Sequence, residues 1–224
     1  MTTFSIKDIF SQGWATFKKN TWFFVGATFA LSVFSMIVNA LTGNGSGFMG
    51  LIGFLISLAA STVVTIAYTR MALAATANEP LQWDSLWAPE HFWYMLGTTI
   101  LQGIIIVIGL VLLIIPGIVA ALMLSMSQLT VVNKKLAPIA AIKESYRLTK
   151  GHLFQLFLFM VCVVLLNILG AIALLVGLLI TVPMTVIMVA LIYRKLMALQ
   201  GAPIAAAPAP QPPQSETPPT PTQE

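Results

Sequence analysis

The sequence contains very little charge for its length. Asp, Glu, Lys and Arg make up 8% of the 224 residues, and AVILMFWYC residues make up 58%, whereas soluble domains carry roughly 25% charged residues. So few charges could not cover the surface of a soluble fold, so the composition excludes an ordinary globular domain. The net charge of +4 does not indicate a nucleic-acid partner, because the basic residues form no arm or stripe.

Cysteine and the common catalytic motifs are also scarce. The single cysteine, Cys162, excludes an internal disulfide, and we interpret it as an apolar packing residue. No G-x-S-x-G, H-E-x-x-H or phosphate-loop motif occurs. Four ionisable residues share one loop without any metal-ligand spacing: Glu79, Asp84, Glu90 and His91. We therefore expect no enzyme activity, cofactor or metal, although convergence of these four side chains would favour an enzyme.

Three long stretches have no charged residue at all. Residues 20–69, 91–133 and 151–193 contain no Asp, Glu, Lys or Arg. A bilayer core takes roughly 20 residues of helix, so each stretch is long enough for two spans. The sequence predicts an all-α fold, a polytopic membrane helical bundle with six transmembrane helices as three hairpins. The expected spans are 22–41, 49–70, 92–114, 117–133, 152–170 and 173–194.

Turn residues separate the spans within each stretch. The run at 42–47 is rich in glycine, Pro116 and Gly117 indicate the second turn, and the third is expected near Gly170, with Gly177 as the alternative. This six-helix domain covers residues 21–200. The segment 201–224 has eight prolines among its 24 residues, a composition typical of a disordered tail.

Residues 1–20 form an N-terminal segment with the pattern of an amphipathic helix. Its apolar residues recur at helical spacing: Ile6, Ile9, Phe10, Gly13, Trp14 and Phe17. The segments 81–90 and 138–150 have similar patterns, and all three are predicted to lie as interfacial helices on the cytoplasmic side. The expected interfacial anchors are Trp14, Trp22, Trp83, Trp87, Trp93, Tyr146, Lys143, Arg147 and Lys150.

The positions of the basic residues predict the orientation. With six spans and an internal N-terminus, every charged residue falls on one side of the membrane. Lys and Arg mark the cytoplasmic side, so both termini are expected in the cytoplasm, with the chain in the bacterial inner membrane. Membrane lipids are the expected surroundings, and a membrane protein or a second copy the expected partner.

The strongly polar residues at depth are few. Asn39, Gln102, Gln128 and Asn167 are interpreted as interhelical hydrogen-bonding residues or, alternatively, as the lining of a substrate path. Pro116 and Pro183 are candidate helix hinges, because proline interrupts helical hydrogen bonding.

Two segments resemble a known bacterial group. Ile114-Ile115-Pro116-Gly117-Ile118 is followed after one span by residues 140–152, with the sequence AAIKESYRLTKGH. This pattern resembles the membrane domain of bacterial glycerophosphoryl diester phosphodiesterases and related uncharacterised six-span inner-membrane proteins. The resemblance implies a helical membrane module. Phosphodiesterase activity in that group belongs to a separate soluble domain, so no catalytic residue carries over.

These features favour a non-catalytic membrane protein, a scaffold or accessory factor in envelope or lipid homeostasis. The alternative is a small transporter or a lipid-translocating protein, which a polar cavity between the helices would favour.

Overall fold

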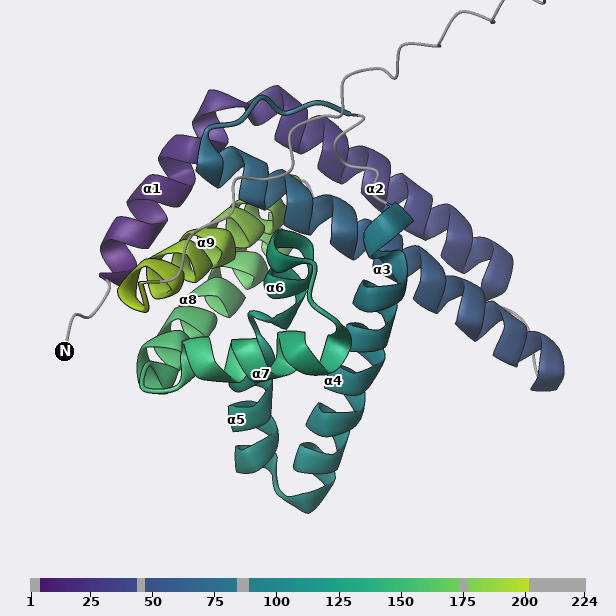
Figure 1. The fold of residues 1–224 in the computed structure, drawn as a ribbon. Coiled ribbons are helices and arrows are strands. Elements are labelled where there is room, and N and C mark those ends of the chain that lie inside the picture. The colour runs from purple at the N-terminus through teal and green to yellow at the C-terminus, as the bar shows by residue number, and fades with distance from the viewer. Residues whose placement is uncertain (1–4, 44–46, 84–88, 174–176, 202–224) are drawn as a thin grey trace, which may run out of the picture.

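The computed structural model describes residues 5–43, 47–83, 89–173 and 177–201 (Figure 1). Within these ranges all regular structure is helical and no strand occurs. Six segments are long and apolar enough to cross a membrane, which confirms the all-helical class with six candidate spans. The elements are α1 (Ile6–Lys19), α2 (Thr21–Thr42), α3 (Gly47–Ala77), η2 (Pro89–His91), α4 (Phe92–Leu112), α5 (Ile114–Leu124), α6 (Ser127–Lys134), α7 (Pro138–Thr149), α8 (Leu153–Ile172) and α9 (Leu178–Leu199).

Three sequence predictions fall partly outside the described residues. The glycine-rich turn is described only at its edges, because 44–46 lie outside. Of the predicted helix at 81–90, residues 84–88 lie outside, and its end forms the 3-10 turn η2. The proline-rich tail lies outside from residue 202 onward.

The N-terminal helix α1 packs its apolar face on protein. Its N-cap Ser5 accepts a hydrogen bond from the Asp8 backbone N–H at 3.4 Å, which satisfies one of the free donors of the first turn. Ile9, Gly13 and Phe17 are buried, and α1 packs against α9. A Cβ added to Gly13 would lie 2.6 Å from Met188 Cγ, so glycine permits this close approach.

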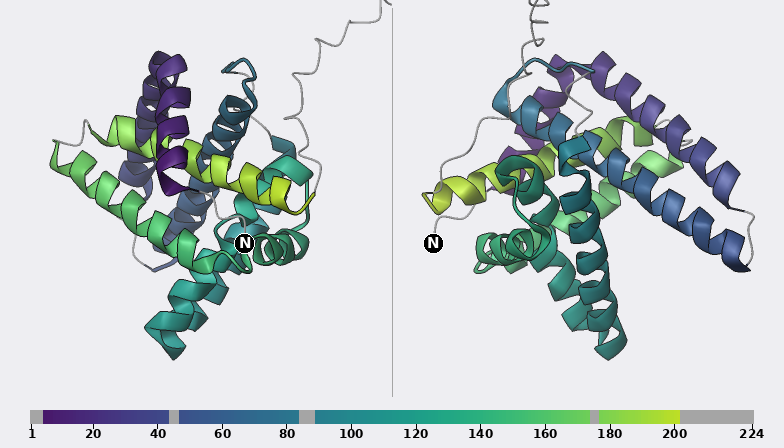
Figure 2. Two further views of the ribbon diagram at one scale, coloured as in Figure 1. Left: turned by 90° about the vertical axis from the view of Figure 1, so that its left-hand side faces the viewer. Right: turned by 45° about the vertical axis from the view of Figure 1, so that its right-hand side comes forward.

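Consecutive long helices pack as three pairs: α2 with α3, α4 with α5, and α8 with α9. Figure 2 shows that the turn-bearing ends of the pairs point in different directions. Glycine brings the backbones together near two of these turns. A Cβ on Gly109 would lie 2.9 Å from Gly117 Cα, and one on Gly177 would overlap the Gly170 carbonyl.

Burial is concentrated at the ends of the pairs opposite the turns. In α2 the buried residues are Phe24, Ala27 and Thr28, near its start, whereas in α3 most lie beyond Thr62, near its end. Large apolar side chains near the turns are exposed instead, including Leu41, Phe48, Val111 and Ile115. The protein therefore has one packed end and three apolar projections.

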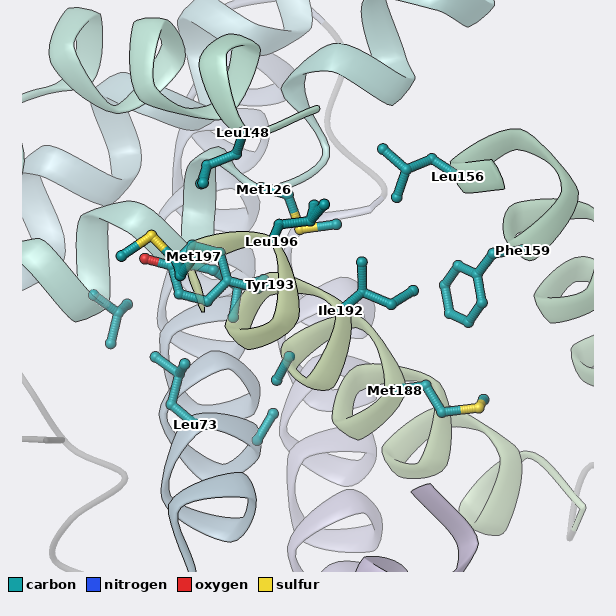
Figure 3. Close-up of a cluster of buried hydrophobic side chains, with 14 of the residues drawn as sticks. Leu73, Met126, Leu148, Leu156, Phe159, Met188, Ile192, Tyr193, Leu196 and Met197 are labelled. Carbon is teal, nitrogen blue, oxygen red and sulfur yellow. The ribbon is translucent and has the colours of Figure 1, made fainter. Parts of the chain in front are cut away.

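The packed end is organised around α9. Helices α1, α2, α3, α7 and α8 all contact it, and Ile187, Met188, Ile192, Tyr193 and Met197 are fully buried. Figure 3 shows Met188, Ile192, Tyr193 and Met197 beside residues contributed by α3, α7 and α8. The chain's last described helix thus forms the centre of its core.

The fourth predicted span is not one continuous helix. The sequence predicts it from 117 to 133, but α5 ends at Leu124 and α6 begins at Ser127. The preceding turn is at Leu113, which is extended (φ −166°, ψ 146°). Pro116 lies in the first turn of α5, where a missing N–H removes no helical hydrogen bond. Gly170 lies within α8, and Gly177 is the N-cap of α9.

Candidate functional site

The break between α5 and α6, at Ser125 and Met126, is here called the interruption. It frees backbone groups that a continuous helix would pair. Helix α7 supplies the missing partners through Ser145, whose Oγ accepts from the Met126 N–H at 3.1 Å and donates to the Met123 carbonyl at 2.7 Å. Thr149 Oγ1 also lies 3.2 Å from the Met123 carbonyl and shares its proton with the Ser145 carbonyl of its own helix, at 2.9 Å. Both hydroxyl residues are completely buried, so α7 holds the interruption in place.

Further polar contacts tie α6 to three neighbouring helices. Ser127 Oγ donates to Gln102 Oε1 of α4 at 2.9 Å. Thr130 Oγ1 lies 3.3 Å from the Ala141 carbonyl of α7, although its closer acceptor is the Ser127 carbonyl of its own helix at 2.6 Å. Asn133 Nδ2 donates to Tyr193 Oη of α9 at 3.0 Å. Ser127, Thr130 and Asn133 of this short helix are therefore bonded within the protein.

A three-residue ion-pair cluster closes the outer side of α6 and α7. Glu144 accepts from Lys134 Nζ at 2.6 Å and from Arg147 Nη2 at 2.7 Å. Burial by itself would raise the pKa of Glu144, but hydrogen bonds from Arg147 and Lys134 and their charges outweigh it and lower the pKa. Glu144 therefore stays ionised and links both helices.

Two of the four predicted intramembrane amides bond to another helix. Gln102 accepts from Ser127, and Asn167 Nδ2 donates to Thr185 Oγ1 of α9 at 3.0 Å. Asn39 is exposed and donates to the Ser35 carbonyl of its own helix, while Gln128 is half-buried on α6. Of the candidate hinges, Pro116 lies in the first turn of α5 and Pro183 lies inside α9.

Most predicted interfacial aromatics are exposed. The exposed fractions are 42% for Trp14, 89% for Trp22, 56% for Trp83, 75% for Trp93 and 44% for Tyr146; Trp87 lies outside the described residues. Among the basic residues, Lys150 Nζ lies 5.9 Å from the Tyr146 ring centroid. Arg147 binds Glu144, and Lys143 is exposed.

His91, one of the four ionisable loop residues named from the sequence, is buried. His91 is 1% exposed, and within the described residues neither ring nitrogen has a hydrogen-bond partner. Its Nδ1 lies 3.6 Å from the Glu90 carboxylate. Asp84 lies outside the described residues, and the described part of the chain contains no group of three His, Cys, Asp or Glu placed to hold a metal.

Protonation of His91 is expected to destabilise the fold. Burial lowers its pKa, the nearby Arg70 and Lys135 lower it further, and Glu90 partly offsets this. With a folded pKa below the unfolded value of about 6.5, the stability contributed by neutral His91 is complete above that value. It is lost as the pH falls through the folded pKa.

The thermal midpoint in detergent should therefore be lower at about pH 5.5 than at about pH 7.5. His91→Gln should reduce this difference. An unchanged difference in His91→Gln would show that another group causes it.

A groove of about 330 Å³ lies between α4, α5 and α7; we call it the Lys143 groove. It is lined by Ile105, Ala120, Met123, Leu124, Ile142, Lys143 and Tyr146. Only Lys143 and Tyr146 of these are exposed side chains, and Lys143 is the one charged residue in the lining. Helix α7 crosses the α4–α5 pair here (Figure 1).

Sequence reasoning did not identify Ser145 and Thr149 as structural residues. Residues 138–150 were predicted as an interfacial amphipathic helix, which left a further, buried face of this helix unnoticed. That face carries Ala141, Ser145, Leu148 and Thr149, all buried. Their spacing of four, three and one residues places them on one face of a helix. This stripe of small and hydroxyl residues could have predicted a buried, hydrogen-bonding face.

The structure thus defines an all-helical protein with six segments long and apolar enough to span a membrane. Residues 85–217, more than half of the chain, match a family described as a domain of unknown function (DUF7847), and the chain belongs to this family. The matched region includes α4 to α9, and with them the interruption and its hydroxyl partners. No curated protein and no solved structure matches the chain.

Proposed function

We propose that the protein spans the bacterial inner membrane with three helical hairpins and keeps both termini in the cytoplasm. The distribution of burial supports this. Large apolar side chains are exposed near the three turns, whereas the basic residues lie at the packed end. Lipid can surround the exposed apolar side chains near the turns, and the cytoplasmic surface accommodates the basic residues at the packed end. Trp22, Trp93 and Tyr146 then serve as interfacial anchors.

Within the membrane, the protein is proposed to act as a non-catalytic scaffold or accessory factor for envelope or lipid homeostasis. The single observation that carries this role is the bonding around the interruption. Hydrogen-bond partners inside the protein exist for the Met123 carbonyl, the Met126 N–H and the side chains of Gln102 and Asn133. Such groups stabilise a fixed arrangement of helices. The relationship to the membrane domain of glycerophosphoryl diester phosphodiesterases remains a prediction.

The orientation can be tested by cysteine labelling of cells. In a Cys162→Ala background, Gly43→Cys places a thiol next to the first turn and Lys135→Cys places one at the packed end; both positions are exposed. A membrane-impermeant maleimide should label Gly43→Cys in intact cells and Lys135→Cys only after lysis. The reverse pattern, or equal labelling, would contradict the proposed orientation.

The scaffold role predicts a stable assembly. Chemical cross-linking in membranes, followed by purification in mild detergent, should yield a reproducible complex with a membrane protein or a second copy. Reproducible recovery of the monomer alone would count against this role.

A second function, lipid or small-molecule transport, is favoured by one region of α9. Pro183 lies inside this helix, Thr181 Oγ1 is buried without a partner in the described chain, and Thr185 bonds Asn167 of α8. Transporters place such irregular helical segments at their substrate sites. Flux in proteoliposomes that disappears in Asn167→Leu but persists in Asn39→Leu would support transport over scaffolding.

A further inference from the structure

The Lys143 groove combines an apolar lining with a single cation at its exposed edge. Ile105, Ala120 and Ile142 are partly buried, Leu124 is fully buried, and Lys143 is exposed beside them. A wholly polar anion would gain nothing from this lining, and an apolar helix would gain nothing from the lysine. The arrangement fits an amphiphile that has a hydrocarbon chain and a negative headgroup.

Two cations of this region, Lys135 and Lys143, have no ion pair or hydrogen bond among the described residues, and of these only Lys143 lines the groove. Lys134 and Arg147 both bind Glu144, and Lys150 lies over the Tyr146 ring. Lys143 has no ion pair or hydrogen bond among the described residues. Residues 134–150 contain five basic residues and one acidic residue, so the local field attracts an anion toward Lys143.

A second groove provides an internal comparison. It has a similar volume, about 340 Å³, and lies between α5 and α8. Its lining is apolar throughout, with Ile115, Val119, Leu153, Phe154 and Phe157 among the contributors. Both grooves can accept a lipid chain, but only the Lys143 groove offers a charge to distinguish one headgroup from another.

We infer that the Lys143 groove binds one anionic phospholipid of the cytoplasmic leaflet. One acyl chain lies against Ile105, Ala120 and Ile142, and the phosphate pairs with the Lys143 ammonium group. Tyr146, beside the lysine, packs against the lipid near its ester region. This inference depends on the proposed membrane insertion and goes beyond the scaffold role by assigning a ligand class to a site.

Native mass spectrometry of the full chain in detergent tests the site. The protein is titrated separately with dioleoyl phosphatidylglycerol and dioleoyl phosphatidylcholine, and the dissociation constant of the first bound lipid is measured for each. One basic residue at an anionic headgroup corresponds to about a fivefold effect. Lys143→Gln should therefore reduce the preference for phosphatidylglycerol about fivefold, and Lys143→Arg should retain it.

The matched control is Lys7→Gln, which removes the same charge from the exposed face of α1 and should leave the preference within about twofold. Ala120→Phe should weaken binding of both lipids by filling the groove. Because this variant can also disturb packing, a photoactivatable acyl chain on the lipid provides a second readout by cross-linking to α4, α5 or α7.

Equal effects of Lys143→Gln and Lys7→Gln would overturn the site, since they would show only a general charge effect. Cross-links confined to other helices, or a groove occupied by a second copy or another protein, would overturn it as well. None of these results would alter the cysteine-labelling pattern, so failure of the lipid site and failure of the proposed orientation can be told apart.

Discussion

Replacing Tyr193 with alanine is expected to lower the free energy of unfolding by about 3–5 kcal/mol, the usual cost of removing a large buried aromatic side chain. Tyr193 is fully buried and belongs to the cluster that also contains Leu73, Met126 and Leu148. Figure 3 shows these side chains around α9. The substitution would leave a cavity where several helices meet, and it would free Asn133 Nδ2 from its hydrogen bond.

The measurement is equilibrium unfolding of the purified protein in mixed detergent micelles. Tyr94→Ala is the matched control, because Tyr94 is 45% exposed on α4 and its loss should cost much less. Tyr193→Phe isolates the hydroxyl group and should cost about 0.6 kcal/mol, the average for a polar contact between membrane helices. Similar losses for Tyr193→Ala and Tyr94→Ala would show that α9 is not the centre of the core.

The sequence was sufficient to predict the all-helical class and the six candidate spans. Absence of charge from residues 20–69, 91–133 and 151–193 requires a nonpolar medium or a large core, and the six segments follow from length alone. These signals are local, since each depends on residues within a few turns of one another.

The packing could not be predicted in the same way, because it depends on helices far apart in sequence. Residues 1–20 have the pattern of an interfacial helix, yet Ile9 and Phe17 are buried beside α9, about 180 residues later. An apolar stripe indicates that a helix face will be covered, but it does not say by what. The one feature of the α1 sequence that fits this packing is Gly13, because only glycine leaves room for Met188 at that position.

The interruption was hidden for a different reason. The segment 114–134 remains apolar through Ser125 and Met126, and neither residue breaks a helix by propensity. The break persists because partners for its free backbone groups come from α7, 19 to 26 residues later. A sequence pattern in α5 and α6 cannot show hydroxyl groups that another helix supplies.

Substitution of Ser145 with alanine is accordingly expected to destabilise the protein by about 1–3 kcal/mol, the cost of leaving a buried backbone donor unpaired. Met126 N–H would lose its partner, whereas the Met123 carbonyl would keep Thr149. Thr149→Val should cost less than Ser145→Ala, because Ser145 still bonds both groups. Ser61→Ala, the same change on an exposed residue of α3 that bonds within its own helix, should have almost no effect.

Hydrogen exchange distinguishes a local role of Ser145 from general loss of stability. In Ser145→Ala, the amides of residues 125–127 should exchange faster before those of α9 do, because the interruption loses its connection to α7 while the core around Tyr193 is retained. Uniform acceleration along the chain would instead assign Ser145 to general packing. A selective effect would show that α7 keeps an otherwise apolar segment divided into two helices, and so fixes the position of α6 against α9.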